Sequence, residues 1–135
     1  MRRMTFLLTL LIPALLSAAG GFDPVKDVPI TVTAGVLSMA IPKGVHLKAR
    51  LFRVILVSAG TLQQGALPVS TEQDEAGDPI WRGRVQVSLS CRDLADPTRL
   101  QVTYQPCTEG RDGVCYLPVK RVLVIPAKEL PTPRP

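Results

Sequence analysis

The segment LQVTYQPCTEGRDGVCYLPVKRVLVIP (residues 100–126) holds two cysteines, Cys107 and Cys115, between two runs that favour β-strands. Residues 100–104 lead into the cysteine pair and residues 119–125 lead out of it, so the chain is predicted to fold back as a hairpin. Opposed residues of antiparallel strands lie close enough for a disulfide. The sequence therefore predicts that the two thiols can pair.

The remainder of the chain also has the pattern of short strands. Apolar and polar residues alternate in 28–34, 45–51 and 81–91, and further apolar runs cover 36–41 and 52–57. Glycine and proline separate these runs, and no stretch has a sustained helical period. The pattern predicts an all-β fold, a sandwich of two antiparallel sheets built from short strands.

The two ends of the chain differ from this strand-rich body. Residues 1–19 combine two arginines, an apolar stretch and small residues, which is typical of a secretory signal peptide, although an uncleaved membrane anchor is the alternative. Residues 20–126 form the predicted domain, and the proline-rich residues 127–135 are predicted to be a disordered tail. The protein is therefore expected to be exported to the periplasm or the extracytoplasmic face of the membrane, where disulfides persist.

Length and composition exclude several classes of protein. The chain has 135 residues and only three cysteines, so it can form a core without cross-links, and a disulfide-stapled mini-protein is not expected. The formal net charge of +5 becomes smaller when the two arginines of the signal segment are removed. No basic run or nucleic-acid motif accompanies this charge, so no nucleic-acid partner is predicted.

The third cysteine and the single histidine are interpreted as structural residues. Cys91 lies on the same predicted strand face as the apolar residues of 85–89, which is typical of a small buried hydrophobe. His46 lies on the polar face of its predicted strand and is interpreted as a surface histidine. A copper site built from Met39, His46 and Cys91 is a weaker hypothesis, because their spacing gives no ligand pattern. The sequence predicts no metal site and no cofactor.

Spacing alone does not separate a redox-active cysteine pair from a structural disulfide. Closing so short a loop stabilises a domain by only about 2.5 kcal/mol in the chain-entropy model, and cysteine pairs of exported proteins are usually structural. The sequence also lacks the Cys-x-x-Cys motif and the alternating strands and helices of a thioredoxin. From spacing alone a structural disulfide is favoured, and a secreted immunoglobulin-like binding module with such a disulfide is the alternative function.

Three motifs, however, resemble the N-terminal periplasmic domain of the DsbD thiol:disulfide interchange family. Around the cysteines the pattern is V-x-Y-Q-x-C, a loop, and then C-Y-x-P followed by an apolar strand (residues 102–125). Upstream, IPKGVHLKA (residues 41–49) resembles the beginning of a strand of that family. QDEAGDPIWRGRVQV (residues 73–87) resembles its acidic cap loop and the strand that follows. The resemblance covers most of the chain after the signal segment.

The resemblance implies an immunoglobulin-like two-sheet sandwich with a redox-active cysteine hairpin at one end. It assigns Cys107 and Cys115 as the redox pair, with Cys115 expected to form the mixed disulfide with partners. Asp74 and Glu75 match the acidic pair of the cap loop. The residues that match those flanking the family's cysteines are Tyr104, Gln105 and Tyr116.

By the same resemblance, the protein is a thiol:disulfide oxidoreductase of the protein-disulfide reductase type. The family's domain takes electrons from a thioredoxin-like protein and passes them to oxidised periplasmic thiol proteins, such as disulfide isomerases and cytochrome c maturation factors. No polytopic membrane segment or thioredoxin module follows residue 126. We therefore expect a free-standing, monomeric relay domain whose electrons come from a separate membrane electron carrier of the DsbD or CcdA type.

The cap loop and the hairpin each depart from the family pattern. The family has a bulky aromatic residue after the acidic pair, whereas this chain has Ala76 and Gly77, so the disulfide is expected to be more exposed unless Trp81 substitutes. The loop of residues 108–114 is also longer than the family's usual loop. Nearby carboxylates are expected to raise the pKa of the thiols by like-charge repulsion, although residues 70–79 alone are typical of a polar surface loop.

Overall fold

The structure is a computed structural model that describes residues 21–132, so the predicted signal segment lies outside the described residues. The described part consists of antiparallel strands and two 3-10 turns, η2 (Ala49–Leu51) and η3 (Ala127–Glu129). No helix within it is long and apolar enough to cross a membrane. The strands are β1 (Ile30–Thr33), β2 (Val36–Ala40), β3 (Val45–Lys48), β4 (Arg53–Leu56), β5 (Thr61–Gln64), β6 (Glu72–Gln73), β7 (Pro79–Trp81), β8 (Arg84–Arg92), β9 (Thr98–Tyr104), β10 (Pro106–Thr108) and β11 (Val119–Ile125).

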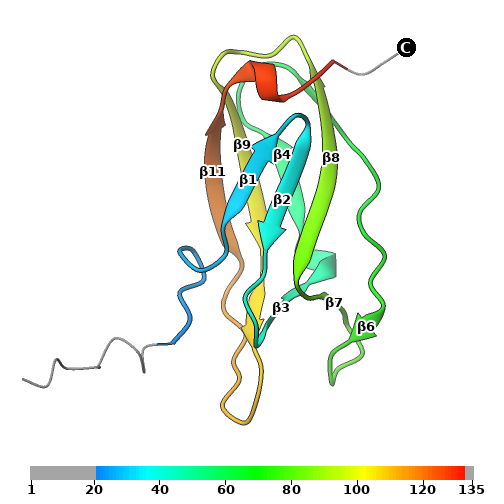
Figure 1. Ribbon diagram of the computed structural model, residues 1–135, viewed down its shortest axis with the longest axis vertical. Coiled ribbons are helices and arrows are strands. Elements are labelled where there is room, and N and C mark those ends of the chain that lie inside the picture. The colour runs from blue at the N-terminus through cyan, green and yellow to red at the C-terminus, as the bar shows by residue number, and fades with distance from the viewer. Residues whose placement is uncertain (1–20, 133–135) are drawn as a thin grey trace, which may run out of the picture.

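Two sheets face each other and enclose the hydrophobic core (Figure 1). One sheet has the strand order β1-β2-β8-β5, and the other has the order β11-β9-β4. A single apolar cluster joins Leu37 and Val87 of the first sheet to Leu100 and Val102 of the second. A third sheet, β10-β3-β7-β6, lies at one end of the sandwich. The predicted all-β sandwich is confirmed, with this small sheet as an addition.

Strand β8 has the alternation that the sequence predicts. Val85, Val87, Leu89 and Cys91 are buried, and most residues between them face solvent. Cys91 is 2% exposed, and burial raises the pKa of its thiol. A thiol that ionises reluctantly among apolar side chains behaves as a small hydrophobe, so the structural interpretation of Cys91 is confirmed.

The predicted hairpin of residues 100–104 and 119–125 is also confirmed. β9 and β11 pair in continuous register, from Tyr104 opposite Val119 to Thr98 opposite Ile125. After Tyr104 the chain leaves β11 and forms β10, which pairs with β3 in the third sheet. This crossing carries the cysteine segment away from the core to the end of the molecule.

The predicted strand over residues 45–51 is shorter in the structure. β3 ends at Lys48, and the turn η2 follows, in which the N–H of Phe52 donates to the carbonyl of Ala49 (3.4 Å). The turn redirects the chain from the third sheet into β4 of the second sheet. Leu51 is therefore exposed, although the alternation placed it on the apolar face.

The prediction of a disordered tail from residue 127 is wrong for the part of the tail that the structure describes. Glu129 accepts hydrogen bonds from the N–H of Ala34 at its carboxylate (2.9 Å) and from the N–H of Gly35 at its carbonyl (2.6 Å). Leu130 is buried in the core. These contacts with the β1–β2 turn order the segment, and a proline-rich composition gives no sign of them.

Candidate functional site

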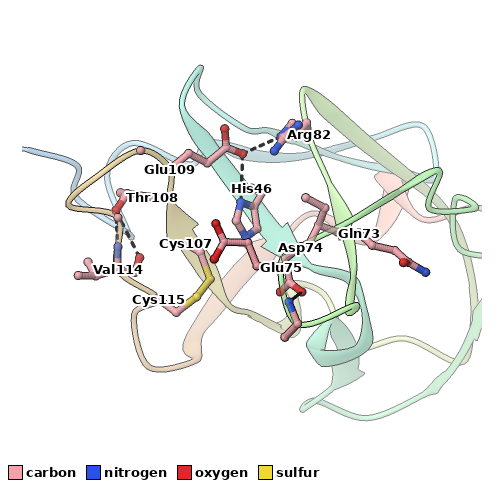
Figure 2. Close-up of a pocket in the computed structure, with 14 residues that line it drawn as sticks. His46, Gln73, Asp74, Glu75, Arg82, Cys107, Thr108, Glu109, Val114 and Cys115 are labelled. Carbon is pink, nitrogen blue, oxygen red and sulfur yellow. Dashed lines mark hydrogen bonds and ion pairs between the residues drawn. A yellow bond between two sulfur atoms is a disulfide. The ribbon is translucent and has the colours of Figure 1, made fainter.

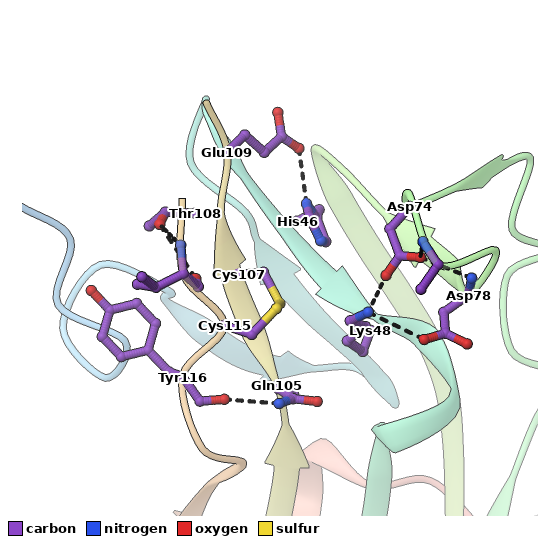
Figure 3. Close-up of a disulfide and its surroundings, with 12 residues drawn as sticks. His46, Lys48, Asp74, Asp78, Gln105, Cys107, Thr108, Glu109, Cys115 and Tyr116 are labelled. Carbon is purple, nitrogen blue, oxygen red and sulfur yellow. Dashed lines mark hydrogen bonds and ion pairs between the residues drawn. A yellow bond between two sulfur atoms is a disulfide. The ribbon is translucent and has the colours of Figure 1, made fainter. Parts of the chain in front are cut away.

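Cys107 and Cys115 form a disulfide at the end of the sandwich (Figure 3). Cys107 belongs to β10, and Cys115 makes an isolated antiparallel bridge with it. Cys107 is only 1% exposed, whereas Cys115 is exposed to solvent. A sulfur nucleophile that approaches from solvent therefore has access to Cys115 and not to Cys107.

The loop between the cysteines is held by its own hydrogen bonds. The N–H of Thr108 donates to the carbonyl of Val114 (2.8 Å), and the N–H of Val114 donates to the hydroxyl of Thr108 (2.9 Å). A side chain at Gly113 would collide with the carbonyl of Thr108, so this turn requires glycine. The longer loop thus keeps the two cysteines opposite each other.

A pocket of about 430 Å³ lies between the cysteine hairpin and the acidic loop that joins β6 to β7 (Figure 2). Both cysteines line it on one side, and Asp74 and Glu75 line it on the other. In Figure 2 the Glu75 side chain points from its loop toward the disulfide. The structure therefore brings the acidic pair and the cysteine pair to one site.

Asp74 organises the acidic loop as a tight turn. Its carboxylate accepts hydrogen bonds from the N–H groups of Ala76 and Asp78, both at 2.9 Å, and it forms an ion pair with Lys48 (Figure 3). The hydrogen bond from Lys48, and after it those from the backbone, lower the pKa of Asp74. Asp74 is thus an ionised carboxylate whose charge is already paired.

This ion pair changes the expected effect of the acidic loop on the thiols. Lys48 also lies 3.3 Å from Asp78, and its hydrogen bond with Asp74 raises the pKa of its ammonium group. Figure 3 shows the Lys48 ammonium in contact with Asp74, and Lys48 lines a pocket together with Cys115. A cation in that place offsets the like-charge repulsion that was expected to raise the pKa of the thiols. Of the acidic pair, only Glu75 is therefore expected to raise the pKa of the thiols.

The interpretation of His46 as a surface histidine is wrong. Its side chain is buried, and its Nδ1 lies 3.0 Å from Oε1 of Glu109. Arg82 donates to the same Glu109 oxygen (2.6 Å) and to Glu72 (2.6 Å). Burial opposes ionisation of Glu109, but the hydrogen bonds from Arg82 and His46 outweigh burial and lower its pKa. The polar face of β3 is covered at His46 by side chains of other segments, since Cys107 and Glu109 of the cysteine hairpin line the same pocket as the imidazole.

A second pocket of about 430 Å³ also reaches Cys115. Gln105 lines it, and its side-chain amide donates to the carbonyl of Tyr116 (2.9 Å), which fixes the backbone next to Cys115. The neighbours of Cys115 in the sequence include two exposed apolar side chains, Val114 at 54% and Leu117 at 85% exposure. The accessible cysteine is thus set among apolar groups that face solvent.

The two tyrosines matched to the cysteine flanks lie in different surroundings. Tyr116 packs edge-on against Phe22 beside the hairpin, with ring centroids 5.6 Å apart. Tyr104 is fully buried, and its hydroxyl donates to the carbonyl of Pro24 (2.6 Å). Tyr104 lines neither of the two pockets that contain the cysteines. It belongs to the core rather than to the surround of the disulfide.

Trp81 does not substitute for the aromatic residue that the acidic loop lacks. Its ring packs edge-on against Phe52 with centroids 5.5 Å apart, and its N–H donates to the carbonyl of Pro68 (3.2 Å). Ala76, directly after the acidic pair, contributes only a methyl group to the pocket. Cys115 accordingly remains exposed, which is the alternative expected without a covering aromatic residue.

Four charged or titratable residues of the site were not predicted from the sequence. Alternation places two of them on one face of β3, but their partners come from distant segments of the chain. One signal for these residues was present in the sequence: the same face of β3 carries two ionisable side chains, His46 and Lys48, directly before the chain turns. The four residues are His46, Lys48, Arg82 and Glu109.

Within residues 21–132, no three His, Cys, Asp or Glu side chains are placed to hold a metal ion. Of the residues in the copper hypothesis, Met39 and Cys91 are buried in the core, while His46 lines the cysteine pocket. The described structure gives no support to that hypothesis.

Comparison with known proteins places the chain in a family. The family model described as "Thiol:disulfide interchange protein DsbD, N-terminal" matches residues 21–126. The structure is similar to the reduced DsbD N-terminal domain of Neisseria meningitidis, with 23% identity, a TM-score of 0.55, and coverage of 81% of this chain and 92% of that chain. It is also similar to a structure of the complex between the DsbD N-terminal and PilB N-terminal domains of the same organism, with 19% identity, a TM-score of 0.54, and coverage of 76% and 85%.

A search of curated protein sequences finds no match. At these identities the two solved structures establish the fold, which confirms the immunoglobulin-like sandwich, and the family match covers most of the described chain. The chain therefore belongs to the DsbD N-terminal family and is a thiol:disulfide interchange domain that carries a cysteine pair.

Proposed function

We propose that this protein is an exported protein-disulfide reductase that relays two electrons through Cys107 and Cys115. The exchange domain comprises residues 20–126, and residues 1–19 direct its export to the periplasm. It takes electrons from a thioredoxin-like protein or a membrane electron carrier. It passes them to oxidised extracytoplasmic thiol proteins, including factors of cytochrome c maturation.

The observation that carries this proposal is the unequal exposure of the two cysteines. Thiol–disulfide exchange begins when a thiolate attacks one sulfur of a disulfide and expels the other. The exposed Cys115 can receive this attack, while the buried Cys107 is retained in the sheet as the leaving group. A disulfide that only staples a fold needs no such division between an accessible and a sheltered sulfur.

The surroundings of Cys115 suit a protein partner rather than a small thiol. Val114, Leu117 and Leu51 expose apolar surface near the hairpin or in the pocket that reaches Cys115. Exposed apolar groups that cluster at one place are typical of a docking surface. The solved complex of another DsbD N-terminal domain with a PilB N-terminal domain supports a protein partner for this site.

The other matched residues take supporting roles in this proposal. Asp74 holds the acidic loop in shape, and Glu75 places a carboxylate toward the disulfide. Gln105 and Tyr116 fix the backbone next to Cys115 through the hydrogen bond between them. Tyr104 contributes only through the stability of the core.

Trapping of mixed disulfides tests the proposal. In Cys107→Ala the exposed Cys115 keeps its thiol but has no partner to resolve a mixed disulfide, so the variant is expected to retain thioredoxin-like proteins and oxidised clients from a periplasmic extract. Cys115→Ala is the matched control, and we expect it to trap little because its remaining thiol is buried. Equal trapping by the two variants, or trapping by neither, would contradict the proposed roles.

A redox titration separates this proposal from a secreted binding module with a structural disulfide. Structural disulfides have potentials below about −300 mV, and exchange-active ones are more oxidising. We expect the Cys107–Cys115 bond to titrate above that value in the folded domain. A bond that resists mild dithiols until the domain unfolds would favour the binding module.

A further inference from the structure

We infer that His46 is the proton acceptor for the Cys107 thiol when the disulfide re-forms. Glu109 orients the imidazole for this step and balances the positive charge that it gains. The inference rests on the proposed function, because it concerns the second step of the same exchange. It adds a residue for which neither the sequence pattern nor the family match gives a role.

The need for a proton acceptor follows from the burial of Cys107. After Cys115 has formed a mixed disulfide with a partner, Cys107 must attack as a thiolate, since the thiol is a poor nucleophile. Cys107 is 1% exposed, so water has little access to its proton, and a docked partner would cover the site further. A base must therefore be supplied from within the protein.

His46 is placed to supply it. It is the residue directly opposite Cys107 in the pairing of β3 with β10, and opposed residues project on the same side of a sheet with their Cβ atoms about 4.5–5.5 Å apart. Both residues line the pocket that contains the disulfide. Figures 2 and 3 show the imidazole between Glu109 and the disulfide from two directions.

The contact with Glu109 determines which ring nitrogen is free. Hydrogen bonds from Arg82 and His46 keep the Glu109 carboxylate ionised, and an ionised carboxylate can only accept hydrogen bonds. Nδ1 of His46, 3.0 Å from that carboxylate, must then carry a proton and donate it. In the neutral imidazole Nε2 then holds the lone pair, which is the form that can accept a proton.

The charged groups around His46 favour this transfer. On its far side Glu109 balances the positive charge that the imidazole gains, and Arg82 holds Glu109 in place. On the acidic loop Glu75 also lines the pocket, whereas Asp74 is paired with Lys48 of the same strand as His46. The arrangement of thiol, imidazole and carboxylate follows the logic by which a carboxylate orients a histidine base.

Ring closure moves one proton and exchanges one disulfide bond for another. Nε2 of His46 takes the proton of the Cys107 thiol, and the Cys107 thiolate attacks Sγ of Cys115. The Cys107–Cys115 bond forms, the bond from Cys115 to the partner breaks, and the partner's sulfur leaves as a thiolate. That thiolate takes the proton back from the imidazolium, so the domain loses two electrons and the partner's disulfide becomes two thiols. In the opposite direction the imidazolium protonates Cys107 as it is expelled.

The test measures the two steps separately with glutathione disulfide as the probe. Reduced full-length protein is mixed with it across the neutral pH range, the reaction is quenched with acid, and mass spectrometry follows the glutathione adduct at Cys115 and its loss on ring closure. In His46→Gln we expect adduct formation at the wild-type rate and closure slowed by roughly 10²-fold, at the lower end of the range of general base catalysis. The deficit should shrink as pH rises, because hydroxide then ionises Cys107 without the histidine.

Two further variants make the result specific. Glu109→Gln keeps a hydrogen-bond partner for Nδ1 but removes its charge, so closure is expected to slow by less than in His46→Gln. Lys43→Gln, an exposed change of charge just before β3, is expected to match the wild type. Closure in His46→Gln at the wild-type rate at every pH would overturn the inference and leave the proposed function intact. A wild-type protein that forms no adduct at Cys115 would remove the proposed function itself.

Discussion

The core of this sandwich and its cysteine end are built from different interactions. Between the large sheets the contacts are apolar, and Leu100 and Cys91 lie in one continuous cluster. At the cysteine end, ion pairs and hydrogen bonds connect the segments, as between Lys48 and Asp74 and between His46 and Glu109. The core excludes charged groups, whereas the cysteine end gathers them around a disulfide.

This difference shows how a small domain can carry a reactive bond without risk to its fold. Apolar burial is non-directional and does not depend on the redox state of the cysteines, whereas polar contacts set orientation and respond to charge. We therefore expect mutations to separate by region. Changes in the core should alter the free energy of unfolding, and changes at the cysteine end should alter exchange.

The largest expected effect comes from replacing one cysteine in each region. Cys115→Ser removes the only accessible sulfur of the pair, so exchange with a thioredoxin-like protein should fall to background. Cys91→Ala removes a buried thiol of the core and should leave the exchange rate at the wild-type value. Stopped-flow fluorescence with a reduced thioredoxin checks both variants. Slower exchange in Cys91→Ala at unchanged folding would mean that the two regions are coupled.

The second prediction concerns a purely apolar contact. Leu100 is fully buried between the sheets, so Leu100→Ala should lower the free energy of unfolding by about 2–5 kcal/mol through lost transfer energy and a residual cavity. Its reduction potential should remain that of the wild type, because Leu100 lines neither of the pockets that contain the cysteines. Denaturant unfolding and a redox titration of the same sample measure the two quantities. A shifted potential would contradict the separation.

Tyr104 tests where the boundary between the two regions lies. Its position before the cysteines suggested a place in the active-site surround, but its hydroxyl is buried against the carbonyl of Pro24. Tyr104→Phe should lower the free energy of unfolding by about 0.5–1.5 kcal/mol, because it removes a partly buried hydrogen bond. Exchange kinetics should be unaffected. An exchange defect without a loss of stability would return Tyr104 to the site.

The sequence predicted those features that depend on local pattern. Period-two alternation located β8 and the buried face of Cys91, and the paired runs around the cysteines located the β9–β11 hairpin. Alternation does not show how many neighbours a strand has. Nor does it show what packs over each face: Cys107 and Glu109 lie beside His46, so His46 is buried on what the pattern marks as a polar face.

The features that were missed depend on contacts between distant segments. β5 (Thr61–Gln64) has a polar sequence and exists because it pairs with β8. The tail is ordered because Glu129 caps the β1–β2 turn. Lys48 acquires its role only when Asp74, far along the chain, folds back beside it. No local propensity contains this information, because the partner lies outside every window along the sequence.

The smallest expected effect concerns the ion pair between Lys48 of β3 and Asp74 of the acidic loop. Lys48→Gln keeps a polar side chain but removes the cation that pairs with Asp74, so the free energy of unfolding at neutral pH should fall by less than in Tyr104→Phe. Lys43→Gln is the matched control, because Lys43 is an exposed lysine in the turn before the same strand. It should leave the free energy of unfolding unchanged.

The lowered pKa of Asp74 determines how the stability difference between the wild type and Lys48→Gln changes with pH. The pKa of Asp74 is lowered in the folded state, so its contribution to stability is present above the usual aspartate value of about 3.9 and is lost as pH falls through the lower folded value. In Lys48→Gln the pKa of Asp74 is lowered less, so this protein should lose less stability as pH falls, and the loss should be complete at a higher pH than in the wild type. The difference in unfolding free energy between the two proteins should then vanish at acid pH, where Asp74 is protonated in both. Urea unfolding at a series of pH values measures it, and a difference that persists unchanged into acid would show that Lys48 acts through packing and not through its charge.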